Sequence, residues 1–192
     1  MILTANLRAE YQDLWRTCEI RPAHAAEVDQ VATRILAHQG RYEAVEASIE
    51  VPWVVVAVIH QMESSGRFDC HLHNGDPLTA RTVHYPTSRP PGDPPFTWEE
   101  SAADALRIRN LPAWNDWSAA GLLYEIEGWN GFGYRTQHPE VLTPYLWSFS
   151  NHYTAGKFVA DHQWSATAVS KQCGAATMLR RLVEQGVVEV TV

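Results

Sequence analysis

The sequence contains little cysteine, no excess of positive charge and no long hydrophobic run, and each shortage excludes a class of protein. Its three cysteines, Cys18, Cys70 and Cys173, are too few for a disulfide-stapled scaffold and leave one thiol unpaired in any pairing scheme. We therefore expect free thiols and a reducing compartment. The 192 residues include 15 Lys and Arg against 22 Asp and Glu, a net charge of −7. Without a basic run, this balance argues against nucleic acid as a partner.

Hydrophobic segments are too short for a membrane protein. The longest apolar run covers residues 51–59, whereas a membrane-spanning helix needs about 20 residues. The first ten residues contain no basic stretch that leads into an apolar one, so no secretory signal peptide is visible. We expect no membrane insertion and a chain that is cytoplasmic as synthesised.

Hydrophobic periodicity predicts a mainly helical protein with a sizeable core, because 45% of the residues are hydrophobic. The first fifty residues contain two expected packing helices. Helices are expected over 4–18, 22–38, 52–63, 97–108, 115–128, 139–142 and 165–185. Pro22, Pro52 and the capping box of Thr97 and Glu100 mark helix starts. The proline-rich segment 67–96 is expected to be a loop or a short irregular β-hairpin, and 129–134 a tight aromatic turn.

Glu63 is the candidate catalytic acid. On a helix it shares a face with Val56 and Ile59, so its carboxyl group is expected where an apolar stripe meets a polar loop. Partial burial there would raise its pKa, as a general acid working near neutral pH requires. The alternative is an ordinary glutamate at the end of a helix.

Three segments together resemble the lysozyme superfamily: 63–65 (Glu-Ser-Ser), 73–78 (His-Asn-Gly-Asp-Pro-Leu) and 124–135 (Tyr-Glu-Ile-Glu-Gly-Trp-Asn-Gly-Phe-Gly-Tyr-Arg). The chain is most similar to phage and bacterial cell-wall muramidases, goose-type lysozymes and lytic transglycosylases. The resemblance implies one lysozyme-like domain over 1–192, with packing helices over 1–50 and a catalytic core over 51–182. It also implies a mainly α, α+β fold: a helical bundle with a small β-hairpin beside the active-site cleft.

The same resemblance assigns residues to the active site. It implies that Glu63 is the catalytic acid and that Trp129 and Asn130 lie in a sugar-binding loop, with Trp where Tyr is usual. The sequence lacks the Gly-Leu-Met-Gln stretch of transglycosylases and goose-type enzymes, which leaves the reaction outcome open.

Asp76 is the candidate second carboxylate. It follows Asn74-Gly75, a strong turn signal, so we expect it on a hairpin across the cleft from Glu63. In an inverting mechanism such a carboxylate activates a water molecule, which Thr79 and Thr82 would help to hold. Alternatively, Asp76 caps a turn before Pro77, or Asp69 is the second carboxylate.

Further residues are candidates for holding the substrate. Tyr134 and Asn130 follow the expected helix stop at Gly128, so we expect them on the opposite wall of the cleft from Glu63. Of Glu125 and Glu127, which point in different directions on a helix, we expect Glu127 to face the cleft. For each of these residues, a place in the core or on the solvated surface is the alternative.

A histidine-rich cluster raises the question of a metal. Cys70, His71, His73 and His84 offer zinc-ligand chemistry, but no His-Glu-x-x-His motif is present. We expect His73 to contact sugar, with simple exposure as the alternative, and we expect no metal and no cofactor.

The sequence thus predicts a muramidase or endolysin-like glycosidase that cleaves the β-1,4 bonds of peptidoglycan, by inverting hydrolysis rather than by lytic transglycosylation. We expect it to act on the cell wall after release or export. A chitinase or chitosanase is the nearest alternative, because a cationic chitosan would suit the net charge of −7. A lysozyme-like module that only binds a glycan or a protein is the third.

Overall fold

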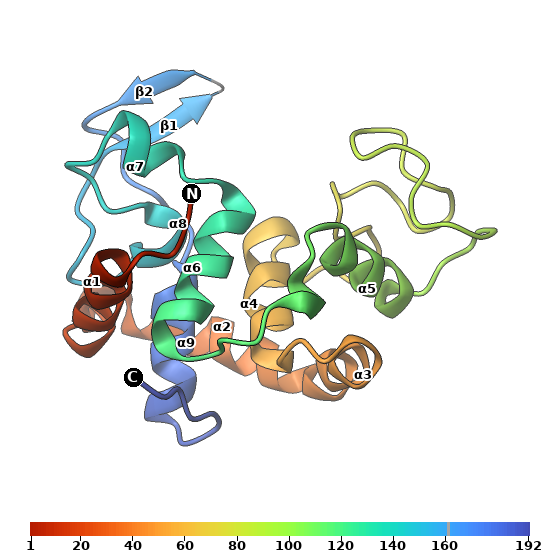
Figure 1. Ribbon diagram of the computed structural model, residues 1–192, viewed down its shortest axis with the longest axis horizontal. Coiled ribbons are helices and arrows are strands. Elements are labelled where there is room, and N and C mark those ends of the chain that lie inside the picture. The colour runs from red at the N-terminus through yellow and green to blue at the C-terminus, as the bar shows by residue number, and fades with distance from the viewer. Residues whose placement is uncertain (161) are drawn as a thin grey trace. The chain divides into compact units, whose positions relative to one another are not determined.

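The computed structural model describes residues 1–160 and 162–192 and confirms that the protein is mainly helical (Figure 1). The helices are α1 (Ala5–Arg16), α2 (Ala25–Ala37), α3 (Gln39–Ile49), α4 (Trp53–Ser64), α5 (Trp98–Ile108), α6 (Ala119–Asn130), α7 (Gly133–Gln137), α8 (Pro144–Trp147) and α9 (Ala175–Glu184). Two 3-10 turns cover Pro22–His24 and Leu111–Ala113. Strands β1 (Lys157–Ala160) and β2 (Gln163–Ser165) form an antiparallel hairpin in which Phe158 pairs with Trp164. Among the helices of the described ranges, none has the length and apolarity needed to cross a bilayer.

The chain divides into two compact units. Unit 1 consists of Met1–Ala32 and Asp116–Val192, and unit 2 is the continuous segment Thr33–Asn115. Helix α2 therefore begins in unit 1 and ends in unit 2.

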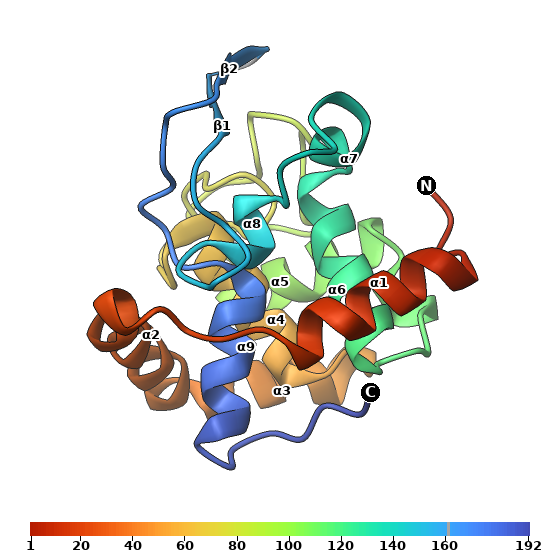
Figure 2. The same ribbon diagram turned by 90° about the vertical axis from the view of Figure 1, so that its left-hand side faces the viewer.

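In unit 1, α6 packs against both α1 and α8, and α8 packs against α9 (Figures 1 and 2). The core side chains of α6 include Leu122, Leu123 and Ile126. Helix α9 begins at a close backbone approach, because a side chain on Gly174 would lie 2.3 Å from the carbonyl oxygen of Leu146. Only glycine fits at that position.

In unit 2, α3 packs against α4 and α5. Every residue of α4 from Val54 to Met62 is buried, which makes α4 the central element of this unit. His60 of α4 lies among aromatic rings, with ring centroids 4.4 Å from Trp98 and 4.6 Å from Phe68. The expected capping box of α5 is confirmed, since both of its reciprocal hydrogen bonds are present.

Four expectations about secondary structure were wrong. Residues 139–142 form a turn rather than a helix, and the short helix α8 begins after them at Pro144, where Thr143 accepts a hydrogen bond at its start. The first fifty residues contain a third long helix, α3, which was not expected: it begins at Gln39, directly after α2, and includes Gly40, where an added side chain would meet nothing within 4 Å. Helix α6 continues through Gly128 to Asn130 and ends at Gly131, whose φ of 90° breaks the helix, so 129–134 is not a turn throughout. The last helix begins at Ala175 rather than near 165, because β2 and an irregular segment precede it.

The location of the hairpin also differs from the expectation. Segment 67–96 contains irregular backbone with one isolated bridge, between Cys70 and Pro77, and the two-stranded hairpin lies instead at 157–165. Proline has no N–H group to donate to a strand ladder, and six prolines stand in 67–96.

All three cysteines are free and buried. Burial raises the pKa of Cys18 to about 11 and that of Cys173 to about 12, and it also raises the pKa of Cys70.

Candidate functional site

Glu63 lies in the last turn of α4, directly after the nine buried residues of this helix. The residue is exposed, so the expected partial burial is wrong. The reason is the end of the helix: Ser65 takes a left-handed conformation with φ 56°, and the chain leaves the core there. The result is an exposed glutamate at the end of a helix that the core holds firmly.

Asp76 is buried and bound by groups of its own loop. One carboxylate oxygen accepts hydrogen bonds from the backbone N–H groups of Val83 (2.8 Å) and His84 (3.0 Å). The other lies 2.6 Å from Nδ1 of His84. The hydrogen bonds from His84 and Val83 lower the pKa of Asp76 to about 2. A carboxylate with so low a proton affinity is a weak general base. Asp76 does not cap the turn before Pro77 either, because its partners are Val83 and His84, and the side chain that accepts within that turn is Asn74.

The two threonines near Asp76 differ in their surroundings. Thr79 is exposed. Thr82 is buried, and its hydroxyl donates to the carbonyl oxygen of Pro86 and accepts a 3.0 Å hydrogen bond from Arg89 N–H. Thr82 therefore holds the loop closed.

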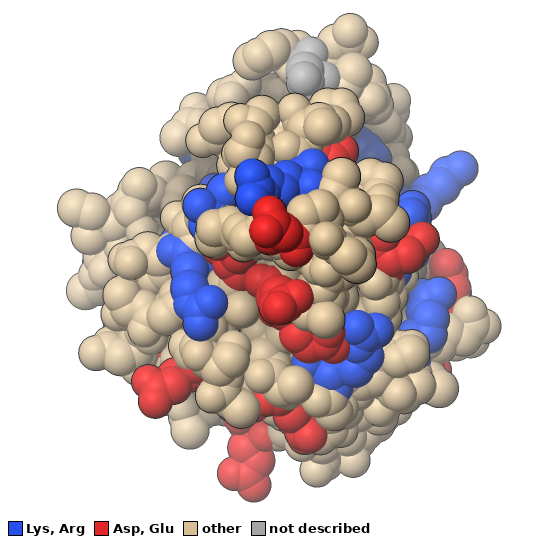
Figure 3. Space-filling model, turned by 90° about the vertical axis from the view of Figure 1, so that its right-hand side faces the viewer, with Lys and Arg blue, Asp and Glu red and all other residues tan. Residues whose placement is uncertain are grey.

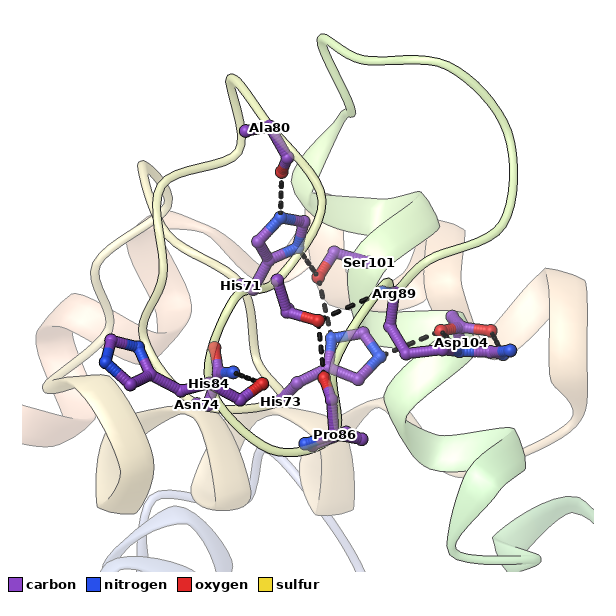
Figure 4. A network of polar contacts seen from close by, with 10 residues as sticks. His71, His73, Asn74, Ala80, His84, Pro86, Arg89, Ser101 and Asp104 are labelled. Carbon is purple, nitrogen blue, oxygen red and sulfur yellow. Dashed lines mark hydrogen bonds and ion pairs between the residues drawn. The ribbon is translucent and has the colours of Figure 1, made fainter.

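His73 belongs to a buried polar network that ties the loop to α5 (Figure 4). Its Nε2 lies 2.8 Å from a carboxylate oxygen of Asp104, which also accepts a 2.9 Å hydrogen bond from Nε of Arg89. The side chain of His73 is only 1% exposed, and burial lowers its pKa. The expected contact between His73 and sugar is therefore wrong, because the ring has no access to a ligand.

The same network continues through Ser101 of α5 to a second histidine. The Ser101 hydroxyl lies 2.8 Å from Nδ1 of His71 and 3.4 Å from Nδ1 of His73. Nε2 of His71 lies 2.8 Å from the carbonyl oxygen of Ala80. A carbonyl only accepts, so Nε2 is the donor, and in the neutral ring Nδ1 accepts from the Ser101 hydroxyl. Ser101, His73 and Asp104 follow one another as in a serine hydrolase, but Ser101 is fully buried and cannot meet a substrate.

The described residues contain no group of three or more His, Cys, Asp or Glu side chains placed to hold a metal ion.

Glu127 is a buried carboxylate of unit 1, with 1% of its surface exposed. It accepts hydrogen bonds from the Tyr11 hydroxyl at 2.6 Å and from Nη2 of Arg135 at 3.0 Å. Arg135 also pairs with Glu10 at 2.8 Å. Burial raises the pKa of Glu127, and the contacts with Arg135 and Tyr11 oppose that rise. The cluster joins α1, α6 and α7, a role that sequence reasoning missed because Tyr11 stands 116 positions from Glu127.

Two pockets of unit 1 share Tyr134. The first, with a volume of about 470 Å³, is lined by Asn130, Tyr134, Gln137 and the hairpin residues Phe158, Val159, Ala160 and His162. The second, of about 340 Å³, includes Tyr134, Glu127 and Arg135 in its lining. The hairpin thus shares a pocket with Asn130 and Tyr134, two of the residues that we expected to contact sugar.

Exposure separates these candidates. Asn130 is exposed at the end of α6. Tyr134 is 9% exposed, and its hydroxyl accepts a 3.3 Å hydrogen bond from Phe158 N–H. Trp129 lies within α6 and is 8% exposed, so its expected place in an open loop is wrong.

The candidates divide between the units. Glu63, His73, Asp76 and Thr79 belong to unit 2, and Glu127, Trp129, Asn130 and Tyr134 belong to unit 1. Comparison with protein families, with curated proteins and with solved structures finds no match to this chain.

Proposed function

We propose that the protein is a glycoside hydrolase with a lysozyme-like fold, which cleaves the β-1,4 bonds of peptidoglycan with Glu63 as the proton donor. The observation that carries the proposal is the position of Glu63, the first exposed residue after nine buried positions of α4. Catalytic groups act best when rigid elements hold them, and α4 is such an element.

The chemistry requires one proton at the leaving group. Glu63 donates it to the glycosidic oxygen while the bond between that oxygen and the anomeric carbon breaks. Glu63 is an exposed residue, and a bound polymer would exclude water from around it. Desolvation favours the neutral acid, so substrate binding itself prepares Glu63 for proton donation.

The first pocket of unit 1 supports a sugar ligand. Asn130 and Gln137 supply amide groups, which both donate and accept hydrogen bonds, and Phe158 and Val159 supply apolar surface. This mixture suits sugar rings that carry hydroxyl and N-acetyl groups.

The first test is Glu63→Gln, which removes the proton and keeps the volume. We expect turbidity clearing of purified cell walls to fall by at least about 100-fold, since general acid catalysis contributes about 10²–10⁴ in rate. Glu43→Gln is the matched control, because Glu43 is an exposed glutamate of unit 2 on α3. Activity above about a tenth of the unsubstituted level would remove Glu63 from the role of acid.

The products and a second substrate complete the test. Hydrolysis adds water and gives reducing ends, whereas lytic transglycosylation gives anhydro products that are lighter by one water, which mass spectrometry separates. The low proton affinity of Asp76 weakens its case as the base of an inverting hydrolase. Chitosan is the second candidate substrate because of the net charge of −7, and the same assay on chitosan decides between the polymers.

A further inference from the structure

The irregular loop of unit 2 presents three side chains to solvent at its tip, which we define as residues 83–85. Val83 is 71% exposed and Tyr85 is 91% exposed, and the side chain of His84 is 77% exposed. Large apolar and aromatic groups at this level of exposure mark binding surfaces when they cluster.

The backbone of the tip is held firmly in spite of this exposure. The Asp76 carboxylate accepts hydrogen bonds from the backbone N–H groups of Val83 and His84. The side-chain Nδ2 of Asn74 donates a 2.9 Å hydrogen bond to the backbone carbonyl oxygen of His84. Thr82 N–H donates to the Arg89 carbonyl oxygen at 2.8 Å and closes the loop behind the tip. A rigid loop loses little conformational entropy when its side chains bind a ligand.

The Asp76 carboxylate also fixes which nitrogen of His84 faces outward. A carboxylate only accepts, so Nδ1 of His84 donates across the 2.6 Å contact with Asp76. In the neutral ring the lone pair then stands on Nε2, which makes no hydrogen bond to the described part of the chain. The tip therefore offers a hydrogen-bond acceptor for a hydroxyl group, on the residue that precedes the exposed Tyr85 in sequence.

Charge argues against a polyanion or an anionic membrane surface as the occupant. The arginines on either side of the tip are paired, Arg81 with Asp93 and Arg89 with Asp104. Figure 3 shows basic and acidic side chains intermixed on one face of the molecule, without a broad basic patch. Nucleic acids and anionic membranes need unpaired positive charge, which this loop does not offer.

The size of the exposed tip decides between a protein partner and a sugar as its occupant. A stable protein interface covers about 800 Å² on each partner and 20–30 residues, whereas the tip exposes two large hydrophobic side chains and one imidazole. A single sugar ring needs only an aromatic face and a few hydrogen-bonding groups. The tip matches a sugar ring in size and in chemistry.

We propose that the loop tip is a sugar-binding surface, in which Tyr85 stacks on a ring of a β-1,4-linked amino-sugar polymer and Nε2 of His84 accepts from a ring hydroxyl. It would hold the insoluble polymer through residues other than the proton donor. The choice of polymer rests on the proposed function, but the surface does not depend on Glu63.

Co-sedimentation with purified peptidoglycan sacculi tests the tip. All proteins carry Glu63→Gln, so that the polymer stays intact during the measurement. We expect Tyr85→Ala to raise the apparent Kd about tenfold, as loss of one large aromatic contact does. Tyr85→Phe keeps the ring and should keep most of the binding. Ile108→Ala is the control, because Ile108 is an exposed hydrophobic residue of α5 in the same unit.

The outcomes are distinct. Sedimentation of Tyr85→Ala at the level of the parent protein would overturn the proposal, and so would equal losses for Tyr85→Ala and Ile108→Ala. Loss for Tyr85→Ala with retention for Tyr85→Phe and Ile108→Ala supports it. Wall cleavage that survives Glu63→Gln would refute the proposed function, and the sedimentation result would still judge the tip by itself.

Discussion

Asn130 and Tyr134 line the same pocket but differ in how far each side chain is buried. Asn130 is exposed, so we expect Asn130→Ala to lower kcat/KM on cell walls and to leave Tm near that of the unsubstituted protein. Tyr134 contacts the rings of Phe158 and Trp164. Truncation of a buried aromatic costs about 3–5 kcal/mol, so Tyr134→Ala should lower both activity and Tm.

Tyr134→Phe is the control for this pair, because it retains the ring and removes only the hydroxyl that accepts from Phe158 N–H. Steady-state kinetics beside thermal unfolding of the three variants give the answer. An Asn130→Ala variant with unchanged kcat/KM would show that the pocket does not bind the substrate.

Individual contacts were the least predictable feature of the sequence. Glu63 at the end of an apolar helix could be located because helix periodicity and the following Ser-Ser-Gly are local signals. The burial of Glu127 could not be predicted, because it depends on contacts with two residues outside its own helix. Tyr11 is distant in sequence, and Arg135 belongs to a different helix. Such contacts follow from packing, which a single sequence does not show.

The loop that carries Asp76 behaves as an element of its own, closed by side chains rather than by a strand ladder. We expect Asp76→Asn to lower Tm by a few degrees, because the amide replaces a charged acceptor of two backbone N–H groups and of His84. Hydrogen exchange of the Val83 and His84 amides should become faster. Loss of catalysis with an unchanged Tm would instead restore Asp76 as a catalytic carboxylate.

Acid should have the same effect on this loop. The pKa of Asp76 is about 2 in the folded protein, below the ordinary value of 3.8. The stability that the carboxylate contributes is therefore complete above about pH 4 and is lost as the pH falls through about 2.

Helices with local start signals were predicted well, and elements fixed by distant contacts were not. The Thr97 capping box located α5 within a residue because its donors and acceptors lie within one turn. The start of α9 depends on the approach of Gly174 to Leu146, which are far apart in sequence. The hairpin at 157–165 is short, and its strands lack a regular alternation of buried and exposed residues.

The stability of the protein as a whole should depend on pH through His60. This residue is fully buried, with Nε2 2.8 Å from the Arg67 carbonyl oxygen and Nδ1 3.1 Å from the Tyr42 hydroxyl. Burial lowers its pKa from 6.5 to about 4. Between pH 6.5 and 4, His60 is protonated in the unfolded chain and stays neutral in the folded protein. The free energy of unfolding therefore falls over this pH range, by about 3 kcal/mol from this group.

Urea unfolding across this pH range measures the effect, and His60→Gln, which does not titrate, is the comparison. We expect the variant to be less stable at pH 7 and to lose less stability than the unsubstituted protein on acidification. His73, whose pKa is also lowered by burial, adds to the fall, and Glu127, whose pKa is raised, opposes it. Equal losses in the two proteins would mean that His60 does not control the acid response.

The three buried thiols give each unit a natural chemical reporter. Cys18 and Cys173 lie in unit 1 and Cys70 lies in unit 2. Alkylating reagents attack the thiolate, which burial suppresses, so modification must wait for local opening of the chain. Peptide mass spectrometry can follow how fast iodoacetamide labels each cysteine in the unaltered protein. The labelling rate of Cys70 therefore measures local opening of unit 2, and the rates of Cys18 and Cys173 measure local opening of unit 1.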